Sequence, residues 1–204
     1  MQSIVCVRHL IFALCLSLLF TGCAGTSSQP TRFYRLDGQL EKAQTISLKP
    51  LPGQQLVGIG PVSLASYLDR PQIVERQSPH RLALNDFDHW AGSLQENIVQ
   101  VITDRLRQKL VDMQVISYPW HGSIRPDYEV LLRVSRFDRE SGRVWLQLRW
   151  TLVRRTDNKL LEMQQLVIEE PARDGSVEAG VAAANRAVGQ LAERIAATIL
   201  AMKR

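Results

Sequence analysis

Side chains that could perform catalysis or bind a metal are present in this sequence, but they are not spaced as those chemistries require. The histidines are His9, His80, His89 and His121. None of them belongs to a His-Glu-x-x-His pair, the helical spacing that holds zinc. Asp86, Asp88 and His89 are close enough along the chain to be considered as ligands, but we interpret them as the polar start of a helix. We interpret Glu169 and Glu170 as the end of a strand and not as an acid/base pair.

Motifs for a nucleophile or a bound phosphate are missing as well. There is no Gly-x-Ser-x-Gly elbow, and Gly58-Ile59-Gly60 is followed by Pro61 and not by the remainder of a phosphate loop. The sequence therefore predicts no catalytic residues, no metal site and no cofactor, and we expect a protein that is not an enzyme.

The cysteines carry the one chemical signal that is specific. They are Cys6, Cys15 and Cys23. Cys23 follows an apolar run, Leu10 to Phe20, after the small residues Thr21 and Gly22. That run is too short for a membrane-spanning helix, which needs about 20 residues, but it fits a signal-peptide core that ends at a small-residue cleavage site. We therefore predict that residues 1–22 are a signal peptide and that Cys23 begins the mature chain.

The tetrapeptide Phe20-Thr21-Gly22-Cys23 resembles the lipobox of bacterial lipoproteins, whose cysteine thiol is acylated. It departs from that motif in having Phe20 where Leu is usual. Cleavage before Cys23 would leave no free thiol, which suits an oxidising compartment. Residues 24–31 are small and polar, so we expect residues 23–31 to be a lipidated flexible tether.

Residues 32–204 have a suitable length for a single domain. The formal net charge of the chain is +5, and its arginines are scattered and are not interleaved with aromatic residues. A nucleic-acid partner is therefore not predicted.

Apolar periodicity predicts two long helices. The first has an apolar face from Trp90 to Leu110, with Asn85 or Asp86 as its cap. The second covers Val177 to Met202, with Leu191 and Ile195 at the centre of its apolar stripe. We interpret this stripe as packing on a sheet, and a coiled coil with another chain is the alternative.

Several segments have strand patterns. The shorter ones are Phe33–Leu36, Leu56–Gly60, the extended pieces on either side of the turn Asp69-Arg70-Pro71, and Val115-Ile116. Three longer alternating segments, Tyr128–Phe137, Val144–Leu152 and Leu160–Ile168, are joined by turn sequences and predict an antiparallel meander. Together the elements predict an α+β fold, with a mostly antiparallel sheet of five or more strands and two long helices packed mainly on one face.

A family resemblance rests on the lipobox and on four further segments: Phe33–Leu36, Gly58–Leu64, Tyr67–Val74, and Trp90 near the first helix. This combination resembles the PqiC/YmbA family of auxiliary lipoproteins, which serve ABC-type transport systems built around MCE proteins. Members of that family often have Pro where this chain has Ala65. The resemblance implies a protein anchored in the inner leaflet of the outer membrane, facing the periplasm. Its implied role is to assist an MCE conduit that moves lipids between the two membranes.

Five residues are candidate partner contacts: Tyr67, Leu68, Asp69, Arg70 and Trp120. One interpretation makes Tyr67 and Leu68 core residues and Asp69-Arg70 a turn with a local ion pair. The other places this loop against an MCE partner or a sister subunit, because apolar residues beside Arg are suited to interface anchors. Trp120, in a loop flanked by prolines, is the second candidate contact.

These observations lead to three hypotheses of function. The first is a non-enzymatic accessory subunit whose partners are an MCE-domain protein and its membrane permease, outer-membrane lipid through acylated Cys23, and a second copy of the chain. Ala24, which is not the Asp that retains lipoproteins in the inner membrane, favours the outer membrane under this family pattern. The second hypothesis is a carrier that holds acyl chains between helix and sheet. The third is a structural assembly lipoprotein of another envelope complex.

Overall fold

A computed structural model describes residues 29–38 and 53–202. Its contacts separate Met1–Pro30 from a second unit, Thr31–Arg204, to which all the elements below belong. The predicted signal peptide and the lipidation site Cys23 lie outside the described residues, as does most of the predicted tether. Within the described ranges, no helix combines the length and the hydrophobicity needed to cross a bilayer.

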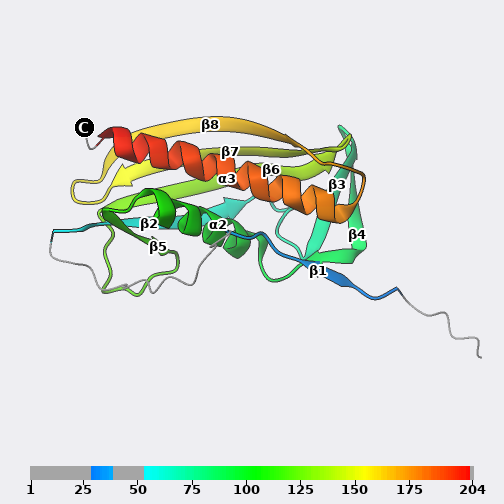
Figure 1. The fold of residues 1–204 in the computed structure, drawn as a ribbon, viewed down its shortest axis with the longest axis horizontal. Coiled ribbons are helices and arrows are strands. Elements are labelled where there is room, and N and C mark those ends of the chain that lie inside the picture. Colours follow the sequence, from blue (N-terminus) through cyan, green and yellow to red (C-terminus); the bar gives the residue numbers. More distant parts are fainter. Residues whose placement is uncertain (1–28, 39–52, 203–204) are drawn as a thin grey trace, which may run out of the picture. The chain divides into compact units, whose positions relative to one another are not determined.

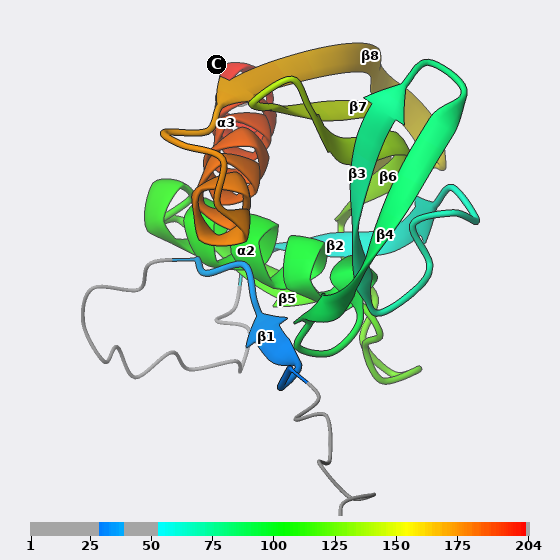
Figure 2. The same ribbon diagram turned by 90° about the vertical axis from the view of Figure 1, so that its right-hand side faces the viewer.

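The second unit contains eight strands and two helices among its described residues. In chain order they are β1 (Arg32–Tyr34), β2 (Gln55–Leu64), β3 (Gln72–Ser78), β4 (Arg81–Trp90), α2 (Leu94–Lys109), β5 (Met113–Ser117), β6 (Tyr128–Glu140), β7 (Arg143–Arg154), β8 (Lys159–Pro171) and α3 (Val177–Met202). The strands form one sheet in the order β1-β4-β3-β6-β2-β5, with β7 and β8 continuing from the other edge of β6. Both helices lie on one face of this sheet, which curves around them (Figures 1 and 2).

Strand β6 organises the sheet because it pairs with three other strands. Its first half pairs in parallel with β2, and Arg139 near its end pairs with Glu75 of β3. Its opposite edge pairs with β7, and β7 pairs with β8, to give the predicted antiparallel meander. The chain therefore moves from β2 to β3 along the same edge of β6, and the Tyr67–Arg70 turn makes that step.

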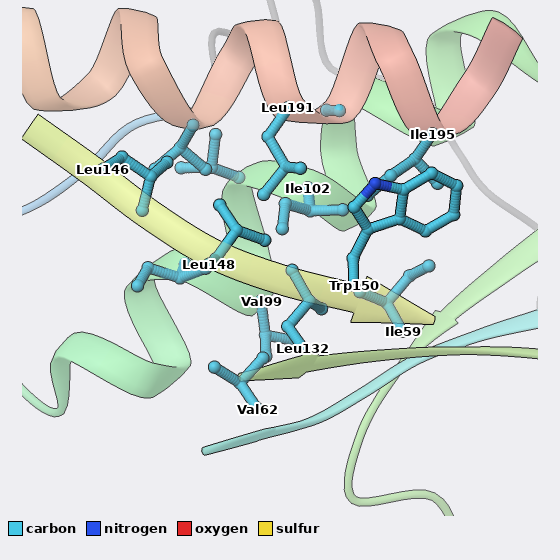
Figure 3. Packing of buried hydrophobic residues seen from close by; sticks show 14 of the residues in the cluster. Ile59, Val62, Val99, Ile102, Leu132, Leu146, Leu148, Trp150, Leu191 and Ile195 are labelled. Atoms are coloured by element: carbon cyan, nitrogen blue, oxygen red, sulfur yellow. The ribbon is translucent and has the colours of Figure 1, made fainter. Parts of the chain in front are cut away.

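The core lies between the helices and the inner face of the sheet (Figure 3). Alternate residues of β7, including Leu146, Leu148 and Trp150, are almost fully buried, as the alternation of the sequence predicts. Leu191 and Ile195 of α3 have no exposed surface, so the predicted apolar stripe packs on the sheet. Burying each such side chain stabilises the fold by about 1.5–3 kcal/mol.

The prediction for the start of the first helix was wrong. Arg81–Trp90, including Asn85 and Asp86, is strand β4, and the helix begins at Leu94 after the N-cap residue Ser93. Gly92 has φ +90°, a conformation that favours glycine and that neither a strand nor a helix adopts, so it separates the end of β4 from the start of α2. Trp90 is buried instead at the end of β4, where its ring stacks on Phe137 at a centroid distance of 6.2 Å.

The α+β class and the two helices on one face are confirmed, but the sheet is mixed. Four pairs of strands run in parallel: β1 and β4, β2 and β5, β2 and β6, and β3 and β6. Helix α2 accounts for one of these pairs, because it carries the chain back so that β5 can run parallel to β2.

Candidate partner-binding face

The turn that contains Tyr67, Leu68, Asp69 and Arg70 connects β2 to β3 beside a bulge in β6. Just before it, the backbone N–H of Ala65 donates to the carbonyl oxygen of Val134 at 2.9 Å. Leu68 is only 2% exposed and belongs to the core, whereas Asp69 is exposed. The turn is therefore anchored on its inner side and open on its outer side.

Tyr67 joins a buried ion cluster on the outer face of β6. The side chain of Asp138 has no exposed surface and accepts from the Tyr67 hydroxyl at 3.1 Å, from Arg76 Nη2 at 2.9 Å and from Arg136 Nε at 2.8 Å. Arg136 Nη2 also binds Glu140 at 2.6 Å, and its guanidinium lies 5.0 Å from the centroid of the Trp145 ring. Burial raises the pKa of the Tyr67 phenol, and the neighbouring Asp138 carboxylate raises it further.

These contacts assign separate roles to the four turn residues. Leu68 lies in the core, as the structural interpretation expects. Tyr67 is half-buried instead and holds the turn against the sheet through Asp138. Asp69 and Arg70 form no ion pair with each other, so the local ion pair of that interpretation is wrong. The Arg70 side chain is half-buried, and in the described part of the chain its Nε has no hydrogen-bond partner.

Trp120 covers the outer side of β2. A Cβ atom at Gly58 would lie 2.8 Å from the Trp120 ring, so only glycine permits this close approach. The Tyr118 ring meets the Trp120 ring edge-on at 5.3 Å. Beside them is an open cavity of about 470 Å³, whose lining includes Arg125 and Arg155.

Tyr67 and Trp120 are on the same face of the sheet but are not brought together. Gly58, under Trp120, pairs with Glu129 near the start of β6, whereas Tyr67 contacts Asp138 near its end. The separation along a strand of that length is roughly 30 Å. The two candidate contacts therefore mark opposite ends of the outer face, the face that the helices leave uncovered.

Comparison with known proteins gives the family. A family model described as "ABC-type transport auxiliary lipoprotein component" matches residues 34–196, most of the chain. The chain belongs to this family. No curated protein matches the sequence significantly.

Solved structures support the fold of this auxiliary lipoprotein. An uncharacterised protein matches with 19% identity and a TM-score of 0.68, over 84% of this chain and 99% of the other. A protein from Xanthomonas campestris matches with 19% identity and a TM-score of 0.63, over 81% of this chain and 93% of the other. At this level of identity the two matches show the fold alone.

The three polar residues considered earlier as metal ligands, Asp86, Asp88 and His89, lie in strand β4 and not at the start of a helix. Asp86 is exposed, and the other two have structural contacts in this auxiliary lipoprotein. Asp88 is buried in β4 and accepts from Arg32 Nε at 2.6 Å and from Arg32 Nη2 at 2.8 Å, which fastens β1 to the sheet. The Arg32 hydrogen bond is the main reason that the pKa of Asp88 is lowered. The His89 ring meets Phe33 edge-on at 6.0 Å. No group of potential ligands suited to a metal occurs among residues 29–38 and 53–202.

Sequence reasoning did not find the ion cluster around Asp138. Tyr67 and Arg76 are 71 and 62 residues away from it along the chain, and no local pattern connects them. One signal was available, because Arg136, Asp138 and Glu140 alternate along β6 and therefore share a face. Glu170 is also paired, with Arg186 of α3 at 2.8 Å, and sits at the strand end as predicted.

Proposed function

We propose that this chain is a non-enzymatic, lipid-anchored accessory subunit of an ABC-type transport system built around an MCE-domain protein and its permease. The observation that carries the proposal is the family match over residues 34–196. The resemblance of Tyr67–Val74 to the PqiC/YmbA lipoproteins adds the MCE partner and intermembrane lipid transport. The ion pairs of Asp88, Asp138 and Glu170 support a role without catalysis, because each carboxylate fastens one element to another.

The anchor of the proposed subunit is the acylated Cys23, inserted in the inner leaflet of the outer membrane. The sequence supports this through the lipobox-like Phe20–Cys23 and through Ala24. Acyl chains stabilise membrane binding by about 0.8 kcal/mol per buried methylene, so several chains hold a protein firmly. In membrane fractionation, the wild type should be found with the outer membrane and Cys23→Ala should be released. Wild-type protein in the inner-membrane fraction would contradict the proposed location.

The Tyr67–Arg70 turn is the proposed contact with the MCE protein or with a second copy of the chain. Asp69 and Arg70 support this, since neither forms a salt bridge in the described part of the chain. Arg70→Glu should weaken recovery of the MCE protein by crosslinking and leave the melting temperature unchanged. Arg194→Glu, a change at an exposed position on α3, is the matched control. Equal recovery for both variants would show that the turn is not a contact.

The carrier hypothesis finds little support in the space between helix and sheet. The apolar pocket there is lined by residues such as Val74, Phe137, Val144 and Val181, and its volume is about 40 Å³. Pockets for small ligands usually measure about 300–1,000 Å³. Mass spectrometry of the purified chain checks this point, because a carrier should retain lipid beyond its own acyl groups.

A further inference from the structure

Two arginines lie directly opposite each other at the centre of the outer face. Arg133 of β6 pairs with Arg149 of β7, and both side chains are exposed. Neither forms a hydrogen bond or an ion pair within residues 29–38 and 53–202. Their Cβ atoms are about 5 Å apart in such a pair, and like charges at this distance destabilise a sheet.

The acidic side chains that β6 and β8 place on this face do not relieve the repulsion, because each of them already binds another arginine. Glu129 pairs with Arg155 at 3.4 Å on one side of the arginine pair. Asp138 and Glu140 bind Arg136 at 2.8 Å and 2.6 Å on the other side. On β8, Glu169 binds Arg143 at 2.8 Å. The charges around Arg133 and Arg149 are thus matched within the protein, while the central pair has no partner.

The arginines border a shallow hollow with apolar surroundings. The hollow has a volume of about 190 Å³ and includes Ser63 of β2 and Thr151 of β7 in its lining. Two apolar side chains on β8 are exposed beside it, Met163 at 51% and Val167 at 57%. Ser63, Arg133, Arg149 and Gln165 pair in sequence across four strands. At the usual spacing of strands this row is about 14 Å wide.

We propose that this outer face binds an acidic segment of a protein partner, with one or more carboxylates between the guanidinium groups of Arg133 and Arg149. The planar guanidinium is suited to carboxylates, and a shared anion removes the repulsion between the two cations. The proposal deepens the proposed function, on which it rests for the identity of the partner, the MCE-domain protein.

A protein segment fits this face better than a lipid headgroup does. Arginine and methionine are enriched in the cores of protein interfaces, and here Arg133 and Arg149 lie beside the exposed Met163 and Val167. The row across four strands is also wider than one phosphate group requires. Trp120 and the Tyr67 turn lie on the same face at its two ends, so an extended partner could contact all three regions.

Zero-length crosslinking tests the contact directly. In the full-length variant Arg133→Lys/Arg149→Lys, carbodiimide should couple the new amines to Asp or Glu side chains in contact with them. Envelope membranes, with the inner and outer membranes kept together, provide the partner, and mass spectrometry identifies the coupled residues. We expect amide links to one acidic segment of that protein. Links to an acidic segment of another protein would support the proposal that this face binds an acidic segment, but would contradict the MCE protein as the partner.

A second measurement separates a binding role from a solvated surface. Arg149→Gln should melt at or above the wild-type temperature, because cross-strand repulsion is removed. In the same variant, recovery of the partner should fall by about tenfold, the effect of an interface arginine worth about 1.4 kcal/mol. Arg194→Gln on α3 is the matched control and should change neither result. Unchanged recovery for Arg149→Gln, or binding only to phosphatidylglycerol vesicles or inorganic phosphate, would overturn the proposal.

Discussion

Replacing Asp138 with asparagine tests whether the buried ion cluster holds the β2–β3 turn in place. The change keeps the size of the side chain and leaves an oxygen that can accept from the Tyr67 hydroxyl. It removes the negative charge that Arg76 and Arg136 share, since both bind the Asp138 carboxylate at under 3 Å. The two cations would then face each other across a neutral group.

The size of the effect follows from the burial of the three charged groups. Removing one partner of a fully buried ion pair costs about 3–5 kcal/mol. The Arg76 and Arg136 side chains are 17% and 21% exposed, so water recovers part of their solvation. We therefore expect a loss of about 2–3 kcal/mol in the free energy of unfolding. For a domain of this size, that loss lowers the melting temperature by roughly 4–12 °C.

Thermal melting followed by circular dichroism measures this difference. The matched control is Glu169→Gln, which breaks a 2.8 Å pair with Arg143 in which the side chains are 36% and 53% exposed. An exposed pair of this kind contributes about 0–1 kcal/mol. If Asp138→Asn melted no lower than Glu169→Gln, the cluster would not stabilise the turn and the reasoning would be refuted.

Three further predictions concern single residues. Leu191→Asp should lower the free energy of unfolding by several kcal/mol in chemical denaturation, because it buries an unpaired charge, and an unchanged midpoint would contradict its position in the core. Asp88→Asn should melt below wild type at pH 7. Because the pKa of Asp88 is lowered in the folded protein, its contribution to stability is present above the unfolded-state pKa of about 3.9 and is lost as pH falls through the folded-state pKa. Calorimetry should therefore show the difference in melting temperature between wild type and Asp88→Asn closing in acid. Gly58→Ala should displace the Trp120 ring and shift the tryptophan fluorescence emission to the red. The same glycine change in a Trp120→Phe variant should leave the emission unshifted.

Local patterns predicted the elements whose periodicity was long and regular. The α3 stripe and the three alternating segments of the meander are confirmed because period and burial agree over many residues. The start of α2 was misplaced because Trp90 stands four residues before Leu94 and so extends the helical stripe. The break at Gly92 was the signal that should have outweighed it.

Parallel pairing could not be predicted from such patterns, because it is decided by contacts between distant segments. Strand β2 pairs with β5 and β6, and the paired residues are at least 58 positions apart along the chain. Polar and apolar residues alternate along a strand in the same way whether the neighbouring strand is parallel or antiparallel. The direction of β5 relative to β2 depends on the path that the chain takes through β3, β4 and α2, and no single segment shows that path.

The arginine pair depends on a bulge in β6 that no local sequence pattern predicts. Near the hairpin turn, Phe137 pairs with Leu146 and Arg136 with Gln147. Continued without interruption, that register would set Arg133 opposite the buried Trp150, with its side chain directed at the core. The register shifts between Val134 and Arg136, so that Arg133 faces Arg149 on the outer side instead.

The same bulge connects the arginine pair to the Tyr67 turn. Val134 and Ser135 provide the carbonyl oxygens that accept from the Ala65 backbone and, at 3.4 Å, from the Tyr67 hydroxyl. Ser135 is the unpaired residue of β6, and its hydroxyl donates to the Gln147 carbonyl oxygen on β7 at 3.1 Å. The segment that carries the family resemblance therefore contacts the bulge at which the register shifts to set Arg133 opposite Arg149. Turn and arginine pair are two parts of one surface, and a variant that loosens the Tyr67 turn should also weaken binding at the arginines, which lie on β6 and on the adjacent strand β7.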